Sequence, residues 1–284
     1  MSGTEIPILP SIRGLAGSCE AWIVDIWGVM HNGARAFETA GDACAKFRQA
    51  GGIVLLLSNA PRPFTAVVSQ LDGFGVARTA YDAVVTSGDV TRAMIAPWQG
   101  RPVLHIGPAR DRGLFEGFAV DFADALVAEV IVCSGLFDDS KQTPQDYAEL
   151  FAGLVARRVP MICANPDLMV ERGDKLVYCA GALAAEYAAI GGEVSYAGKP
   201  HWPVYARALT AIDARKGRSV AKDKVLAIGD GIETDLRGAY VAGLRSVFIA
   251  SAIHAPEGLS PAMLQQLFRS RPFAPVAALA ALTW

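Results

Sequence analysis

The chain has 284 residues, of which 52% are hydrophobic and 19% charged, so it can bury a large core and is long enough for two domains. A formal net charge of −2 is unlike the basic footprint of proteins that bind nucleic acid or anionic membrane surfaces, so neither is expected as a partner. No apolar run approaches membrane-spanning length, and residues 1–13 lack the pattern of a signal peptide. The sequence therefore predicts a cytoplasmic protein.

The cysteines predict free thiols rather than a disulfide framework or a structural zinc site. They are odd in number, widely spaced and never arranged as a C-x-x-C pair, which favours buried thiols in a reducing compartment. The five positions are Cys19, Cys44, Cys133, Cys163 and Cys179.

The first part of the chain alternates between predicted strands and helices. An apolar run over 21–29, interrupted by the single carboxylate of Asp25, predicts a buried parallel strand with Asp25 at its carboxyl end. Apolar residues at helical spacing predict helices over 34–50 and 61–71. Further apolar strands are expected over 53–57 and 83–85, each followed by small polar residues. This order predicts a doubly wound parallel sheet with its functional edge on the carboxyl side.

The middle of the chain predicts a second, smaller α/β unit. Strand-like pieces lie at 102–106, 130–133 and 160–163, with a helical piece over 144–158. The sheet of the first unit is expected to resume with strands at 194–196, 225–228 and 246–249, and the alanine-rich stretch 275–284 is expected to form a short packing helix. The predicted fold is thus an α/β protein with a Rossmann-like core over 1–88 and 193–284 and an inserted domain over 89–192.

Polar clusters at four predicted strand ends together describe a site for phosphate chemistry. Asp25 is a candidate nucleophile, and Ser58 with Asn59 offers a hydroxyl and backbone N–H groups at a helix start, where anions bind. Lys199 supplies a cation after a tight turn. Asp230 and Asp235, in a strand-to-helix loop, suit a hard divalent cation.

Each cluster also has a plain structural interpretation, as a helix cap, a turn or a surface lysine. Their combination favours chemistry, because a carboxylate that attacks a dianionic phosphate needs Mg²⁺, a lysine and amide dipoles to neutralise charge. An aspartyl-phosphate intermediate follows from that arrangement.

The four clusters resemble the four motifs of the haloacid dehalogenase superfamily, and specifically its NagD-like subfamily IIA, which carries an α/β cap domain between the second and third motifs. The matching stretches are Val24-Asp25-Ile26-Trp27-Gly28-Val29, Leu57-Ser58-Asn59, Gly198-Lys199-Pro200, and Gly229-Asp230-Gly231 through Thr234-Asp235. Thr86-Ser87, Asn165-Pro166-Asp167 and Gly181-Ala182-Leu183 are also similar to that subfamily.

The resemblance implies a Mg²⁺-dependent phosphatase that acts on a small phosphorylated metabolite, such as a sugar phosphate or a nucleotide-like phosphate. It implies Asp25 as nucleophile and metal ligand, the backbone carbonyl of Trp27 and the carboxylate of Asp230 as further ligands, and Asp235 at or next to the metal. Ser58 and Lys199 would hold the phosphoryl group, with Asn59 and Gly28 in the same substrate-binding set. A homodimer is expected by analogy with the subfamily.

Trp27 departs from the family pattern, in which this position carries a second aspartate that protonates the leaving oxygen and later activates water. An indole N–H cannot exchange a proton near neutral pH, and loss of the acid should cost roughly 10²–10⁴ in rate. Either another group, such as His31 or His201, substitutes for it, or the enzyme acts on phosphates whose leaving groups need little protonation.

Two further alternatives stay open. The superfamily's dehalogenases carry an aromatic residue at this place, but they work without a metal, whereas Asp230 and Asp235 keep the spacing of a Mg²⁺ site. A module that binds phosphate ligands without turnover would have no need of Asp25.

Overall fold

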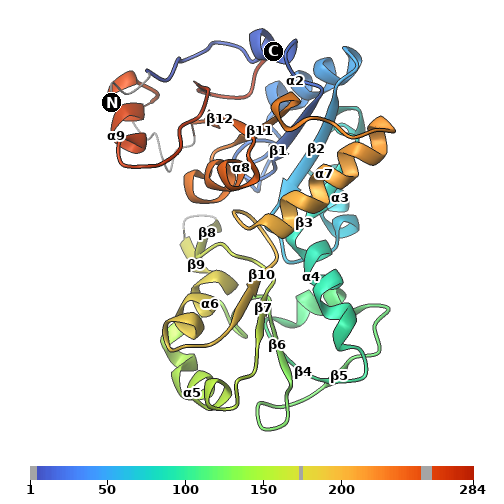
Figure 1. The fold of residues 1–284 in the computed structure, drawn as a ribbon, viewed down its shortest axis with the longest axis vertical. Coiled ribbons are helices and arrows are strands. Elements are labelled where there is room, and N and C mark those ends of the chain that lie inside the picture. The colour runs from blue at the N-terminus through green and yellow to red at the C-terminus, as the bar shows by residue number, and fades with distance from the viewer. Residues whose placement is uncertain (1–4, 173–174, 251–257) are drawn as a thin grey trace. The chain divides into compact units, whose positions relative to one another are not determined.

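The computed structural model describes residues 5–172, 175–250 and 258–284 (Figure 1). The chain divides into two compact units, which are described separately. The first comprises Met1–Ser58, Val68–Val85 and Tyr205–Trp284, and the second comprises Asn59–Val67 and Thr86–Val204. The assignment of 1–88 and 193–284 as catalytic core and of 89–192 as an inserted cap remains a prediction.

The first unit is built on a six-stranded sheet with the order β13-β12-β11-β1-β2-β3. The registers of β1 with β2 and β11, and of β12 with β11 and β13, are all parallel. All five residues of β1 are buried, which explains why the sequence of this strand is apolar throughout rather than alternating. The strands are β1 (Ala21–Asp25), β2 (Ile53–Ser58), β3 (Ala83–Thr86), β11 (Val225–Gly229), β12 (Arg245–Ile249) and β13 (Ala277–Leu279).

Helices flank this sheet and pack through their apolar faces. α2 buries Ala40, Ala43, Cys44 and Phe47, and the Phe47 ring stacks on Trp22 of β1 with 3.9 Å between the ring centroids. α2 begins later than its predicted range because Phe37, the residue before it, has an extended backbone. The helices are α1 (Arg13–Ala16), α2 (Glu38–Gln49), α3 (Phe64–Gly73), α7 (Trp202–Lys216), α8 (Arg237–Ala242) and α9 (Pro261–Phe268).

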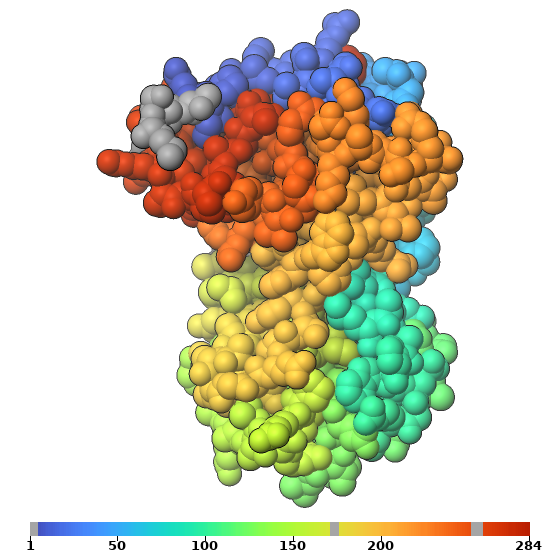
Figure 2. All heavy atoms as spheres, viewed as in Figure 1, coloured from blue at the N-terminus to red at the C-terminus, as the bar shows by residue number. Residues whose placement is uncertain are grey.

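The second unit holds a five-stranded sheet with the order β10-β7-β6-β4-β5, again parallel in its registers. One core cluster joins this sheet to α5 and α6, and another joins it to the end of α4, so both faces of the sheet contribute to a core. Figure 2 shows the close packing of the green and yellow segments of this unit. Its elements are α4 (Ser87–Ile95), β4 (Pro102–Ile106), β5 (Asp121–Phe122), β6 (Val130–Cys133), α5 (Ala148–Ala156), β7 (Met161–Cys163), β8 (Met169–Arg172), β9 (Lys175–Tyr178), α6 (Ala180–Ala189) and β10 (Val194–Tyr196).

Two sequence-based expectations are wrong. The strand at 194–196 does not resume the first sheet, because β10 pairs with β7 in the second one, with Tyr196 opposite Cys163. The chain leaves β7 and returns through α6 to the neighbouring position in the same sheet, which is the usual parallel crossover. The stretch 275–284 contains strand β13 rather than a helix, because Ala277 and Ala278 are buried in parallel pairing with β12, and this pairing overrides their helix propensity.

The cysteines agree with the prediction: all five are free, and all except the partly buried Cys19 are buried. Within the described part of the chain, helices are too short or too polar to cross a membrane.

Candidate active site

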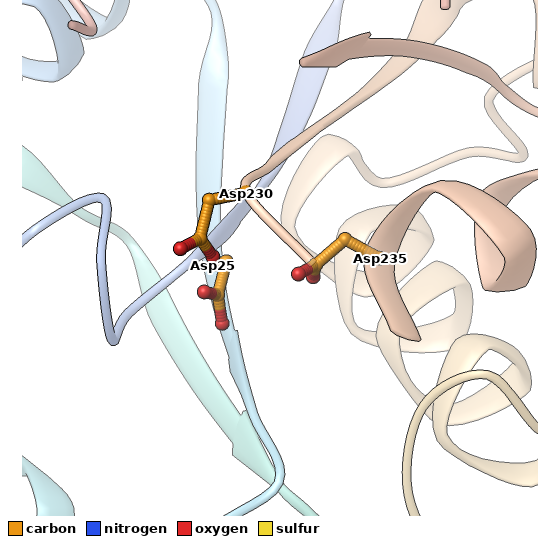
Figure 3. Close-up of side chains that lie close together, drawn as sticks. All are labelled: Asp25, Asp230 and Asp235. Carbon is orange, nitrogen blue, oxygen red and sulfur yellow. The ribbon is translucent and has the colours of Figure 1, made fainter. Parts of the chain in front are cut away.

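Three carboxylates converge in the first unit at the carboxyl edge of its sheet. Asp25, Asp230 and Asp235 each offer one oxygen, and these ligand atoms all lie within 4.8 Å of one another (Figure 3). Asp25 and Asp235 are buried, whereas Asp230 is partly exposed. The structure thus brings together the three acidic residues that the sequence predicts for a metal site.

The sheet topology explains why residues about 200 positions apart meet. β1 and β11 are parallel neighbours with Val24 opposite Ile228, so Asp25 and Asp230 leave the sheet at the same edge. Asp235 lies in a single helical turn over Ile232–Leu236, where its Oδ2 accepts a hydrogen bond from the Gly231 backbone N–H at 3.2 Å. That bond orients the third carboxylate.

Glycines allow the backbone to approach these carboxylates closely. Gly28 has φ of +84°, and a Cβ at this position would overlap the carboxylate of Asp230. A Cβ at Gly229 would overlap the side chain of Asp235. The turns on both sides of the acidic cluster therefore depend on residues without side chains.

The donor set fits a hard divalent cation. Carboxylate oxygens are the ligands that Mg²⁺ prefers, and three negative charges this close repel one another unless a cation or protons neutralise them. Two of the three carboxylates are largely withdrawn from water, which strengthens that repulsion.

A second group of predicted site residues meets in the second unit. The Asn59 carboxamide clamps the Lys199 backbone: Lys199 N donates to Asn59 Oδ1 at 2.7 Å, and Asn59 Nδ2 donates to the Lys199 carbonyl at 3.1 Å. Asn59 Nδ2 also donates to Asp167 Oδ1 at 2.8 Å. Lys199 is 3% exposed, so its position is fixed by backbone bonds and burial together.

Asp167 has a role here that sequence reasoning missed. The motif Asn165-Pro166-Asp167 signalled similarity to the subfamily, but nothing in its spacing connected it with Asn59, which lies 108 residues earlier. Burial raises the pKa of Asp167, while the hydrogen bond from Asn59 and the charge of Lys199 act in the opposite direction. Asp167 therefore lies within electrostatic range of the predicted phosphoryl-binding lysine.

Ser58 ends β2 next to the acidic cluster in the sheet. Leu57, the residue before it, pairs with Asp25 of β1. Ser58 therefore lies on the adjacent strand, one residue further toward the carboxyl edge than the candidate nucleophile. The side chain is partly buried, in keeping with a position at the sheet edge.

Trp27 and His31 form one aromatic unit in the loop after β1. The Trp27 and His31 rings meet edge to face with 5.4 Å between centroids, and His31 lies 4.6 Å from the Phe74 ring. His31 is buried, and its Nδ1 accepts a hydrogen bond from the Gly33 backbone N–H at 2.9 Å.

This arrangement argues against His31 as a replacement acid. Burial lowers its pKa to about 4, so the imidazole is neutral near pH 7, and its Nδ1 lone pair is already engaged. His201, the other candidate, stacks face to face on Tyr196 in the second unit, with 4.3 Å between centroids.

Comparison with known proteins agrees with this geometry. Residues 22–120 match the model of a family described as haloacid dehalogenase-like hydrolase, and residues 196–269 match a second model described as HAD-hydrolase-like. The chain is 44% identical to a hydrolase of the haloacid dehalogenase-like family from Brucella suis 1330, whose crystal structure superposes with a TM-score of 0.82 over 87% of this chain and 96% of that one.

More distant relatives carry phosphatase names. The 4-nitrophenylphosphatase from Thermotoga maritima is 21% identical, with a TM-score of 0.69 over 94% of this chain and 96% of that one. The dihydroxyacetone phosphatase from Corynebacterium glutamicum (strain R) is 34% identical over 93 residues, which span 32% of each protein. The chain therefore matches about a third of that curated relative's length.

Proposed function

Because the chain belongs to the haloacid dehalogenase-like hydrolase family, we propose that it is a Mg²⁺-dependent phosphatase that uses Asp25 as its nucleophile. The cluster of Asp25, Asp230 and Asp235 carries this proposal, since it combines a buried carboxylate at a strand end with two oxygen donors for a cation. The phosphatase names of two relatives support the reaction type.

The carboxylates of Asp25, Asp230 and Asp235, together with the backbone carbonyl of Trp27, would hold the metal. When bound, Mg²⁺ supplies positive charge that offsets the repulsion between the Asp25 carboxylate and the phosphate oxygens. The chain after Trp27 can pass this close to the Asp230 carboxylate because Gly28 has no Cβ, which would overlap it.

The reaction proceeds in two displacements at phosphorus. An Asp25 carboxylate oxygen attacks the phosphorus atom in line, a bond forms between them, and the ester P–O bond breaks with its electron pair going to the leaving oxygen. Water then attacks the phosphorus of the aspartyl phosphate, which regenerates the Asp25 carboxylate and releases inorganic phosphate.

Lys199 and Ser58 hold the transferring phosphoryl group, and Asn59 and Gly28 complete this binding set. The double hydrogen bond with Asn59 fixes the Lys199 backbone, and burial restricts the lysine side chain, so less conformational freedom is lost when an anion binds. Asn59 therefore acts as a positioning residue for Lys199.

The substrate is a small phosphorylated metabolite, a sugar phosphate or a nucleotide-like phosphate. The dihydroxyacetone phosphatase among the relatives supports a small phosphate ester.

The proposal is tested with p-nitrophenyl phosphate and acetyl phosphate, each with Mg²⁺ and with a chelator. We expect turnover that requires Mg²⁺ and falls by at least about 10³-fold in Asp25→Asn, because the amide is a far weaker nucleophile. Asp42→Asn, an exposed carboxylate on α2 paired with Lys46, is the matched control and should retain parental activity. Turnover that is independent of metal, or unchanged in Asp25→Asn, would refute the proposal.

A further inference from the structure

We infer that the Trp27 indole forms the wall against which the leaving group packs, and that this wall selects phosphates with a planar, apolar leaving group, such as an aryl phosphate. The inference rests on the proposed function for its reaction, and among the small phosphates proposed there it disfavours sugar phosphates. It concerns binding and can be measured without turnover. It assigns a role to the residue that replaces the expected acid in the first motif.

Gly33 and His31 both hold the indole in place. Gly33 has φ of +84°, and a Cβ there would overlap the Trp27 ring atoms Cη2 and Cζ3, so the ring lies directly against the Gly33 backbone. His31 meets the ring edge to face, and the hydrogen bond from Gly33 N–H to His31 Nδ1 joins the two supports.

The supports are themselves fixed. His31 is 3% exposed and packs on Phe74, and the Gly28 backbone N–H donates to the His31 carbonyl at 2.9 Å. The ring therefore has a defined orientation, unlike a surface tryptophan that samples several rotamers.

Despite these supports, Trp27 is 40% exposed, so part of the indole remains open to a ligand. Trp27 is two residues from Asp25 in the chain, and its neighbour Gly28 lies against the Asp230 carboxylate. An aromatic ring that its neighbours hold, that is partly exposed and that follows the candidate nucleophile this closely is suited to act as a stacking platform.

The chemistry of the indole defines the leaving group that fits. A flat apolar face binds another flat apolar group through offset or edge-to-face contact. It removes water from the hydroxyl groups of a small polyol without offering hydrogen bonds in return. The indole N–H also cannot deliver a proton to the departing oxygen, so a leaving group that departs readily as an anion suits the same wall. Aryl phosphates have both properties.

The test compares the binding of phenylphosphonate and methylphosphonate, which share a phosphoryl-like head and resist hydrolysis, by calorimetry with Mg²⁺ present. We expect the parent protein to bind phenylphosphonate roughly 5- to 10-fold more tightly than methylphosphonate. Trp27→Leu keeps an apolar side chain but removes the aromatic face, and it should reduce the ratio of the two affinities to about 2-fold or less, chiefly through weaker binding of phenylphosphonate.

Gly33→Ala gives a second test that leaves Trp27 in place. The added Cβ should displace the indole and reduce the preference for phenylphosphonate in the same way. Gly51→Ala is the matched control, because Gly51 has a similar φ of +91° but open space where its Cβ would stand, so it introduces the backbone strain without touching a ring.

An unchanged preference in both Trp27→Leu and Gly33→Ala, each verified as folded by its unfolding transition, would overturn the inference. So would a parent protein that binds the two phosphonates equally. A parent protein that shows the Trp27-dependent preference but hydrolyses no phosphate ester would instead refute the proposed phosphatase and leave the inference standing.

Discussion

At the scale of single residues, the site depends on a few side chains placed by strand ends and on glycines that leave room for them. Asp25 and Asp230 could be predicted from sequence because they stand at the ends of apolar strands, and parallel strands bring their carboxyl ends to one edge. Asp235 could be predicted because it lies in the turn that follows the second of these strands. The bond between Asn59 and Asp167 could not, because neither residue lies in a periodic pattern that specifies its partner.

Trp27→Asp should restore a group that can donate a proton to the leaving oxygen. Hydrolysis of alkyl phosphates, whose leaving groups are poor, should therefore rise by about 10-fold or more relative to hydrolysis of p-nitrophenyl phosphate. The measurement is kcat/KM across a series of phosphate esters. A uniform change across the series would show that protonation of the leaving group does not limit the parent enzyme.

His31 makes stability depend on pH in acid. Its pKa is about 4 in the folded chain against 6.5 ordinarily, so below pH 6.5 the unfolded chain takes up the proton first. The stability that the neutral His31 contributes to the folded chain is fully present above pH 6.5. As the pH falls to 4, the free energy of unfolding decreases by up to about 3 kcal/mol.

Urea unfolding between pH 4 and 6.5, with a chelator present, measures this dependence. His31→Gln removes the titrating ring and should flatten the decline. His105, whose pKa burial and the Arg112 charge also lower to about 4, remains in both proteins and so cancels in the comparison. Equal slopes for parent and variant would contradict this account of His31.

At the scale of elements, Asp89 connects the starts of two helices. Its side chain accepts from Thr86 N at 3.0 Å in the capping box of α4, and from Phe64 N at 3.1 Å at the start of α3. The carboxylate is buried, so both N–H groups depend on it.

Asp89→Ala should lower the free energy of unfolding by about 2–3 kcal/mol, because the Thr86 and Phe64 backbone N–H groups lose their acceptor, although the Thr86 side chain still caps α4. Asp146→Ala, which removes the exposed capping box of Thr143, should cost about 1 kcal/mol or less. Urea denaturation measures both. Equal losses of unfolding free energy in the two variants would show that burial does not strengthen the contribution of Asp89 to stability.

Element prediction succeeded where pattern and position agree. The strand over 102–106 matches β4 and that over 130–133 matches β6, because apolar runs bounded by polar residues describe buried strands. Pattern alone assigns β10 to the wrong sheet, because its three residues do not reveal which neighbour they pair with. It predicts a helix at β13, because alanine favours helices unless strand pairing decides otherwise.

At the scale of the whole molecule, metal binding at the acidic cluster should be coupled to folding. A cation that binds only the folded chain stabilises it by mass action, by about 2.7 kcal/mol at a concentration 100 times its dissociation constant. Mg²⁺ should therefore raise the thermal unfolding midpoint, and Asp230→Asn should abolish most of that shift. An identical shift in the variant would place the stabilising ion elsewhere.

The measurement that tests the central claim most directly is chemical trapping of the phosphorylated aspartate. The protein is mixed with p-nitrophenyl phosphate and Mg²⁺, quenched in acid and treated with borohydride, which reduces an acyl phosphate to the alcohol, and residue 25 is then identified by peptide mass spectrometry. We expect homoserine at position 25 in samples that were turning over, and none without substrate. Product release with residue 25 recovered entirely as unmodified aspartate, when quenched during turnover at saturating substrate, would contradict Asp25 as the nucleophile.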